Sequence, residues 1–343
     1  MNATTRIDPG QDFLFANLHG RRSRFLRGES LRRIAQSGSP DVLLRALAGR
    51  GVKVASLDEA RRELVRDLGN ELKQVMTMLD ARTAVFHEAF LRRFWYEDLK
   101  TILHMRVLGE KESWAEGLLV DLPGLPRLPV PALLTARNGA DFVAVLPPGE
   151  RDIAQVVDGL AADGNIPRAD TLLDRRFFAG LLAAAGNCPR SARPLARELV
   201  EGEIDMSNIV TLLRNRRTYH LPTSDVVALC LPDGPATSRK LEALAEAKTP
   251  AEAASLLPRH LAECLRGREL ADLPRVEDAL REWLHRLACN GFRDYERTRR
   301  SSVAYPYLKW IEMLNLGRLG EGMRFGLQPP ELASLLIREG TRV

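Results

Sequence analysis

The segment Ile204-Asp205-Met206-Ser207-Asn208-Ile209-Val210-Thr211-Leu212-Leu213-Arg214 carries a pattern that the chain contains three times. The other two copies lie at residues 94–103 and 311–319. When the copies are aligned on Asp98, Asn208 and Asn315, each has apolar residues four positions before this polar residue, one after it and four after it. The polar residue and the apolar residues at positions +1 and +4 are Asp98, Leu99 and Ile102; Asn208, Ile209 and Leu212; and Asn315, Leu316 and Leu319. This spacing places the apolar residues on one face of a helix and predicts three similar helices.

Roughly 110 residues separate successive copies, far more than the 20–50 residues of ordinary solenoid repeats. We therefore expect three related small domains at residues 1–115, 116–228 and 229–343, rather than a stack of short units. A proline-rich stretch at 121–131 has too many prolines for a helix interior, and we interpret it as a connection near the first boundary.

The composition is that of a globular protein whose elements are mainly helices. The 343 residues are 45% hydrophobic and 28% charged, with only 6% aromatic residues, and leucine, alanine and arginine are abundant. The four cysteines form no CxxC pair, so we expect free thiols in a reducing cytoplasm. The start of the chain has no apolar core typical of a signal peptide, and the longest apolar run, 177–185, is about half the length of a membrane span.

Local signals mark most of the expected elements. We predict helix starts at Pro40, near Leu57, near Ile153, at Leu173-Asp174, at Thr249-Pro250 and at Val276, and further helices at 84–91, 94–108 and after Pro306. Residues 141–146 can form a short isolated strand. The glycines in 317–322 are expected to loosen or end the third signature helix.

The residues that most enzymes need are not arranged for catalysis. The six histidines form no HxH, HxxxH or HExxH pattern, so zinc-site spacing is missing. The glycine-rich 317–322 segment has no Lys-Ser/Thr and follows no predicted strand, which argues against a nucleotide site. We therefore predict no catalytic residues, no cofactor and no metal.

Arginine clusters give the chain a formal net charge of +5. A run of like charges is most often a solvated helix face, and the alternative is docking of an acidic partner or of lipid head groups. The candidates for docking are Arg21, Arg24, Arg214, Arg216 and Arg217. No RNA-binding aromatic motif or zinc finger is present, so specific nucleic-acid recognition is not expected.

The polar residue of the pattern also has two interpretations. A buried Asp98, Asn208 or Asn315 can connect neighbouring parts of the chain through backbone hydrogen bonds, or it can belong to a ligand site. The pattern favours the structural role, since nothing near these residues indicates a ligand.

Together these segments resemble the C subunit of V/A-type ATPases, which is called the d subunit in the eukaryotic vacuolar enzyme. Phe15-Ala16-Asn17 with the following arginines is similar to the family's tyrosine-alanine-asparagine opening. Residues 98–103, 204–214 and 307–316 resemble its three internal copies, the middle one most specifically. The chain departs from the family at Gly317 and Gly320, where arginine and isoleucine are usual, and in its proline-rich 121–131 stretch.

The resemblance implies an all-α fold with three similar helical-bundle domains in a pseudo-threefold funnel. It implies a non-catalytic rotor subunit, one copy per complex, that couples the D and F subunits of the central stalk to the membrane proteolipid ring during proton or sodium transport. It further implies a peripheral location on the cytoplasmic face of the cell membrane. Two alternatives are a helical-repeat scaffold and a basic interaction protein unrelated to the ATPase, for instance one that binds nucleic acid; an enzyme is the least expected class.

Overall fold

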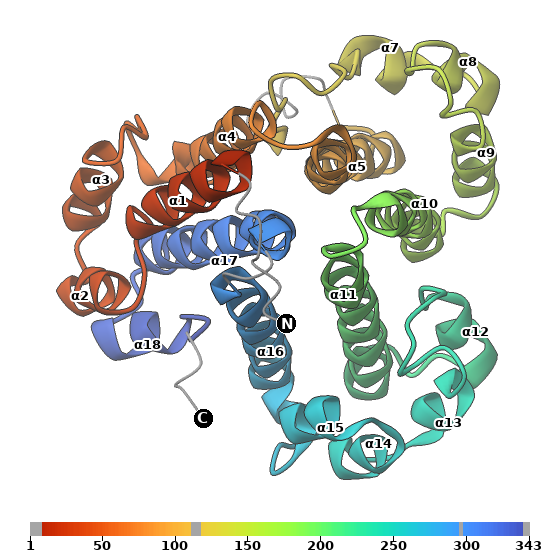
Figure 1. Ribbon diagram of the computed structural model, residues 1–343. Coiled ribbons are helices and arrows are strands. Elements are labelled where there is room, and N and C mark those ends of the chain that lie inside the picture. Colours follow the sequence, from red (N-terminus) through yellow and green to blue (C-terminus); the bar gives the residue numbers. More distant parts are fainter. Residues whose placement is uncertain (1–8, 111–117, 295–297, 339–343) are drawn as a thin grey trace, which may run out of the picture. The chain divides into compact units, whose positions relative to one another are not determined.

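The computed structural model describes residues 9–110, 118–294 and 298–338, and within these residues the fold is all-α, as predicted (Figure 1). The helices of the first half are α1 (Pro9–Ser23), α2 (Glu29–Ser37), α3 (Pro40–Ala48), α4 (Leu57–Met76), α5 (Ala81–Leu108), α7 (Val130–Thr135), α8 (Gly139–Ala144), α9 (Ile153–Asp163) and α10 (Ile166–Asn187). The second half has α11 (Arg193–Arg214), a π-helix η1 (Asn215–Tyr219), α12 (Thr223–Ala228), α13 (Leu241–Glu246), α14 (Pro250–Leu256), α15 (Arg259–Leu265), a 3₁₀-helix η2 (Leu270–Asp272), α16 (Leu273–Arg293), α17 (Thr298–Arg324) and α18 (Pro329–Ser334).

The chain forms two compact units, each assembled from separate parts of the sequence. Unit 1 contains residues 1–87, 184–199 and 278–343, and unit 2 contains residues 88–183 and 200–277. Helices α5, α10, α11 and α16 each contribute residues to both units. The division into three domains at 1–115, 116–228 and 229–343 stays a prediction.

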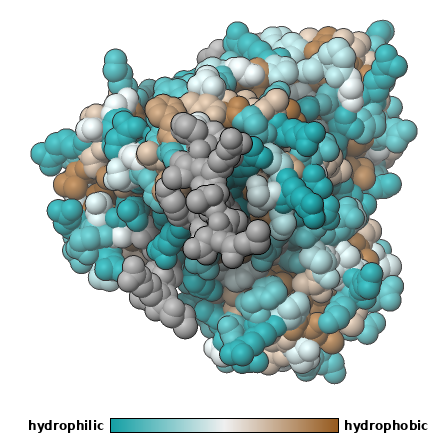
Figure 2. Space-filling model, viewed as in Figure 1, coloured by the Kyte–Doolittle hydropathy of each residue, from teal (hydrophilic) through white to brown (hydrophobic). Residues whose placement is uncertain are grey.

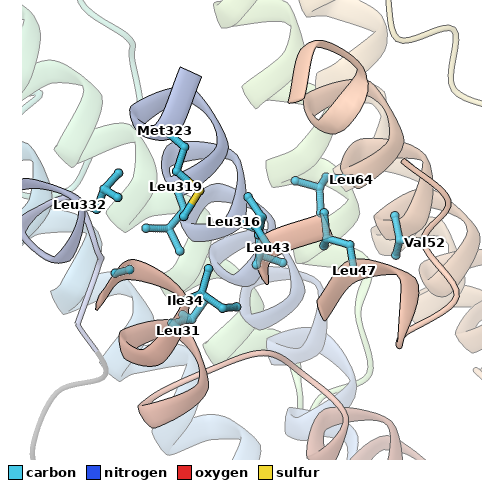
Figure 3. Close-up of a cluster of buried hydrophobic side chains, with 11 residues drawn as sticks. Leu31, Ile34, Leu43, Leu47, Val52, Leu64, Leu316, Leu319, Met323 and Leu332 are labelled. Atoms are coloured by element: carbon cyan, nitrogen blue, oxygen red, sulfur yellow. The ribbon is translucent and has the colours of Figure 1, made fainter. Parts of the chain in front are cut away.

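Unit 1 is organised around α17, the helix of the third signature. In Figure 1, α1 and α4 lie alongside α17, and α18 lies beside α2. Leu316, Leu319 and Met323 follow one another at helical spacing on α17 and pack against buried side chains of α2, α3, α4 and α18 (Figure 3). The pattern residues at +1 and +4 of this copy therefore lie in the core of unit 1.

Unit 2 combines pairs of short helices with longer helices that are connected by ion pairs. Helix α8 packs against α9, and α14 packs against α15 (Figure 1). Arg93 of α5 donates two hydrogen bonds to the Glu203 carboxylate of α11, at 2.8 and 3.2 Å, and all of these groups are buried. Lys100 of α5 lies 2.6 Å from the Asp174 carboxylate of α10. A two-point pair such as that of Arg93 with Glu203 fixes the rotation of one helix against the next.

Several local predictions are confirmed, and others are wrong for identifiable reasons. Helices begin at Pro40 and Pro250 as expected. The two helices expected at 84–91 and 94–108 are one continuous helix, α5. Helix α10 begins at Ile166 rather than at Leu173, because the Asn165 side chain accepts a hydrogen bond from the N–H of Arg168 in the first turn.

The short strand considered at 141–146 is instead helix α8 (Gly139–Ala144). The Asn138 side chain caps this helix by accepting a hydrogen bond from the Asp141 N–H at 2.8 Å. Gly139 allows α8 to approach α9 closely, because a Cβ at this position would overlap the Ala154 carbonyl oxygen. Capping and close packing outweigh the β-branched and aromatic character of this stretch.

The glycines of the third signature do not end its helix. Helix α17 continues through Gly317, Gly320 and Gly322 to Arg324, and the left-handed residue Gly326, with φ of 72°, follows it. Gly322 leaves room for α18, since a Cβ there would lie 2.6 Å from a methyl group of Leu332. This glycine therefore serves helix packing rather than helix termination.

Pro306 lies inside α17 rather than before it. Proline has no N–H, so the carbonyl of Ser302, four residues earlier, has no helical donor from this position. His87 supplies one: its Nε2 lies 2.8 Å from the Ser302 oxygen, and both residues are buried. Because a carbonyl can only accept, the His87 Nε2 must carry the proton.

We predict a measurable energetic coupling between His87 and Pro306. His87→Leu should lower the free energy of unfolding by about 1–3 kcal/mol, because it leaves the buried Ser302 carbonyl unpaired. In the double variant with Pro306→Ala, the restored N–H can bond that carbonyl, so the loss should be smaller than the sum of the single effects by about 1 kcal/mol or more. Urea unfolding of the four proteins measures this coupling, and a value near zero would contradict the assignment.

We also predict that His87 makes stability fall in mild acid. Burial lowers the pKa of His87 to about 4, although its bond to Ser302 opposes this shift. The unfolded chain therefore binds this proton first, and the stability falls as the pH decreases from about 6.5 towards 4. The contribution of His87 should make the protein about 2 kcal/mol less stable at pH 5 than at pH 7.5.

The variant His87→Gln can keep an N–H donor but does not titrate. Subtracting its unfolding free energies from those of the natural chain at each pH isolates the histidine from the carboxyl groups. Equal slopes for both proteins between pH 5 and 7.5 would show that His87 is not the titrating group.

Candidate functional site

The three polar residues of the signature segments are buried, and each binds the backbone of an aliphatic residue farther along the chain. Asp98, Asn208 and Asn315 are 7, 0 and 3% exposed. Asn208 exchanges two hydrogen bonds with Leu231, accepting from its N–H at 2.7 Å and donating to its carbonyl at 2.9 Å. Asn315 does the same with Ile337, at 2.8 and 3.1 Å.

In the first copy, a carboxylate takes the place of the asparagine amide in binding the backbone. An ionised carboxylate can only accept, so Asp98 cannot bind a carbonyl as the asparagines do. Its two oxygens instead accept from consecutive N–H groups, those of Val120 and Asp121, each at 3.0 Å. Val120 is buried like Leu231 and Ile337. All three side chains therefore hold a buried aliphatic residue at an equivalent place.

In the second copy, one more residue separates the polar residue from the left-handed residue that ends the helix and from the residue that it binds. The π-helix η1 accounts for this extra residue. Val120 and Ile337 follow their polar residues by 22 positions, whereas Leu231 follows Asn208 by 23. A left-handed residue ends each signature helix: Gly109 and Gly326 follow the polar residue by 11 positions, and His220 follows it by 12. A π-helix has more residues per turn than an α-helix, so it accommodates one extra residue without changing the helix direction.

In the second and third copies, the segment that connects the left-handed residue to the residue bound by the asparagine also has the same structure. In both, a short helix begins three residues after the left-handed residue: α12 after His220 and α18 after Gly326. Val226 of α12 and Leu332 of α18 occupy the same place and are buried, at 1 and 0% exposure. The corresponding residues of the first copy, 112–117, lie outside the described part of the chain.

The apolar residues of the pattern are buried in all three copies. The exposed fraction is at most 7% for the residues at position −4, which are Phe94, Ile204 and Ile311. It is at most 6% for those at positions +1 and +4, which are Leu99, Ile102, Ile209, Leu212, Leu316 and Leu319. The signature segments thus contribute interior residues rather than a surface.

Two buried carboxylates near the signatures were not identified from the sequence. Asp205 and Glu312 lie three residues before their asparagines and are 3 and 4% exposed. Asp205 accepts hydrogen bonds from the N–H groups of Ala236 and Thr237. Glu312 accepts from the Leu26 N–H at 2.5 Å and pairs with Lys309 at 3.0 Å. Burial raises the pKa of both carboxyls, although these partners oppose the shift.

Of the five arginines predicted as docking residues, three make hydrogen bonds to other residues of the chain. Arg21 donates to Asn17 at 2.7 Å and to Glu71 at 3.1 Å. Arg214 donates to Glu277 at 2.8 Å, and Arg216 lies 3.4 Å from the Glu246 carbonyl oxygen. The side chains of Arg24 and Arg217 are exposed. A docking role for these five residues stays a prediction.

Among the residues that the structure describes, no three His, Cys, Asp or Glu side chains group closely enough to hold a metal ion. None of the described helices is long and apolar enough to cross a membrane.

Together the fold and the three buried connections define an all-helical protein with a threefold internal repeat. The model of the ATP synthase (C/AC39) subunit family matches residues 14–335, so the chain belongs to this family. The resemblance found in the sequence is thereby confirmed. A search of curated proteins returned no significant match.

We predict that aspartate cannot replace asparagine in the third copy. In Asn315→Asp the carboxylate can accept from the Ile337 N–H, but it leaves the buried Ile337 carbonyl without its donor. The free energy of unfolding should fall by at least about 2 kcal/mol at neutral pH. The deficit should shrink as the pH is lowered, because a protonated carboxyl can donate to that carbonyl.

Chemical denaturation at several pH values measures this effect. Asn70→Asp, at an exposed position of α4, is the matched control and should change stability by less than about 0.5 kcal/mol. If the two variants were equally stable, the hydrogen bonds of Asn315 would not matter for the fold.

Proposed function

We propose that this chain is the non-catalytic coupling subunit of a V/A-type ATP synthase or ATPase. It connects the D and F subunits of the central stalk to the proteolipid ring, with one copy per complex, and lies peripherally on the cytoplasmic face of the cell membrane. Its three repeats form helical-bundle domains around a pseudo-threefold axis, like a funnel that receives the end of the stalk. The family match over residues 14–335 is the observation that carries this proposal.

The physical requirements of the role agree with the described interior. A part that passes torque between two others must not deform, and close-packed interhelical cores resist deformation. The polar residues that the three copies share are engaged with the chain's own backbone, as Asn208 is with Leu231. These residues therefore support the shape of the protein, and the proposal assigns them no chemical step.

The charge of the chain supports a role beside an acidic partner or an anionic surface. A net charge of +5 favours association with either through long-range attraction. In this proposal, exposed arginines such as Arg24 and Arg217 contribute to the attraction. The alternative of an unrelated basic scaffold has no comparable support from the family match.

We predict that the full-length chain co-purifies with the other ATPase subunits. From native membranes dissolved in mild detergent, a tagged chain should recover the D and F subunits and the proteolipid ring, with one tagged chain per D subunit by quantitative mass spectrometry. Complexes assembled without the chain should hydrolyse ATP without moving ions, since the link between the stalk and the ring is missing.

Recovery of the chain alone, free of ATPase subunits and of membrane, would overturn the proposal. Binding of the purified chain to duplex or single-stranded nucleic acid at micromolar concentration, with a steep salt dependence, would favour the basic interaction protein instead. An unrelated tagged cytoplasmic protein from the same cells controls for non-specific recovery.

A further inference from the structure

The three signature helices share an exposed apolar residue at their C-terminal ends. Leu108, Tyr219 and Phe325 are 69, 60 and 74% exposed, and they are three of the four most exposed large apolar side chains among the described residues. Each stands directly before the left-handed residue that ends its helix: Gly109, His220 or Gly326. We call these three side chains the helix-end residues.

The helix-end residues are equivalent because they lie at nearly the same distance in sequence from the polar residue of their copy. Leu108 and Phe325 follow Asp98 and Asn315 by ten positions, and Tyr219 follows Asn208 by eleven, the extra residue being that of the π-helix. The same one-residue difference occurs in the buried connections. The three side chains thus occupy one place in the repeat, although the amino acids differ.

The local fold gives no reason for an apolar residue at this place. Where a left-handed residue ends a helix, the usual apolar contact involves the residue after it and one in the last helical turn, not the residue before it. In the third copy the motif closes through the backbone, with the Leu327 N–H bonded to the Gly322 carbonyl. A polar side chain at Phe325 would leave that bond unchanged.

Single exposed apolar residues are common on proteins, so each helix-end residue alone would need no explanation. On the face drawn in Figure 2, apolar residues are scattered among hydrophilic ones in this ordinary way. Recurrence at one place in all three copies is different. In the first two copies a second large apolar side chain near the helix end is also exposed: Val107 at 43% and Leu221 at 38%.

We propose that the helix-end residues are the contact points of this chain with the proteolipid ring. This inference rests on the proposed function. A ring of identical subunits presents the same surface many times by rotation, so each copy of the repeat can place its apolar residue against an identical site. A single asymmetric partner, such as the central stalk, would offer three different sites and would not favour the same class of residue in every copy.

Arginines near the helix ends are compatible with such contacts. Arg324 stacks over the Phe325 ring with its guanidinium carbon 4.9 Å from the ring centre, and Arg217 is exposed two residues before Tyr219. Arginine and aromatic residues are enriched where proteins meet. Basic residues also complement the dipole at a helix C-terminus, so the apolar side chains are the distinctive feature.

The test measures binding of the full-length chain to detergent-purified proteolipid ring and, separately, to the soluble head with its central stalk. The variants are Leu108→Ser, Tyr219→Ser, Phe325→Ser and the triple variant. Each contact is small and the losses of separate contacts add, so a single change should weaken ring binding about tenfold and the triple change at least about a hundredfold. Binding to the stalk should be unchanged.

Phe13→Ser and Val85→Ser are the matched controls, since Phe13 and Val85 are 62 and 53% exposed but do not occupy the helix-end place of the repeat. Both should bind the ring as the natural chain does. Circular dichroism and melting temperature should be the same for all variants, because each change replaces an exposed side chain.

The possible outcomes separate this inference from the proposed function. If the natural chain binds neither the ring nor the stalk, the proposed function fails. If it binds the ring and the triple variant binds equally well, only this inference is overturned. It is also overturned if the variants lose the stalk but keep the ring, or if the natural chain self-associates in sedimentation while the triple variant is monomeric.

Discussion

The structure depends on a buried side chain that holds the backbone of a segment returning to its helix. A chain that leaves a long helix and comes back must bury N–H and C=O groups that no helix satisfies, and an unpaired group is costly. The side-chain amides of Asn208 and Asn315 each bind both the N–H and the C=O of one residue. Asp98 instead accepts from the N–H groups of two consecutive residues, because its carboxylate has no donor. The returning segment, and with it the short helix α12 or α18, is placed by this contact.

The sequence predicted the helices of the repeat better than it predicted their ends and their partners. Spacing at −4, +1 and +4 identifies a buried helical face, and all nine of these apolar residues are buried. The residue that each polar side chain holds is more than twenty positions away, in a segment without periodicity, so no pattern indicates it. The π-helix adds one residue to the middle copy, and this insertion is visible only when two intervals are compared in the structure.

The wrong predictions at Pro306 and Gly322 share one physical cause: a contact from elsewhere in the chain outweighed a local preference. Pro306 continues α17 because His87, more than two hundred residues away in the sequence, supplies a donor to the open carbonyl. Gly322 continues it because α18 needs the space of a missing Cβ. A glycine or proline in the sequence lowers the local preference for helix, but whether the helix ends at that residue depends on its tertiary contacts.

Burying charges such as Arg93 with Glu203, or Lys309 with Glu312, contributes little net stability, since desolvation offsets much of the attraction. What these pairs supply is geometry, because a paired buried charge tolerates few alternative arrangements. Combined with the three backbone connections, they favour a single arrangement of the helices within each unit. The residues that identify the family are therefore interior residues, fixed by packing and hydrogen bonds. Partners can contact only the exposed residues, and among these the recurrence of Leu108, Tyr219 and Phe325 at one place in the repeat is better evidence of a contact than any single arginine cluster.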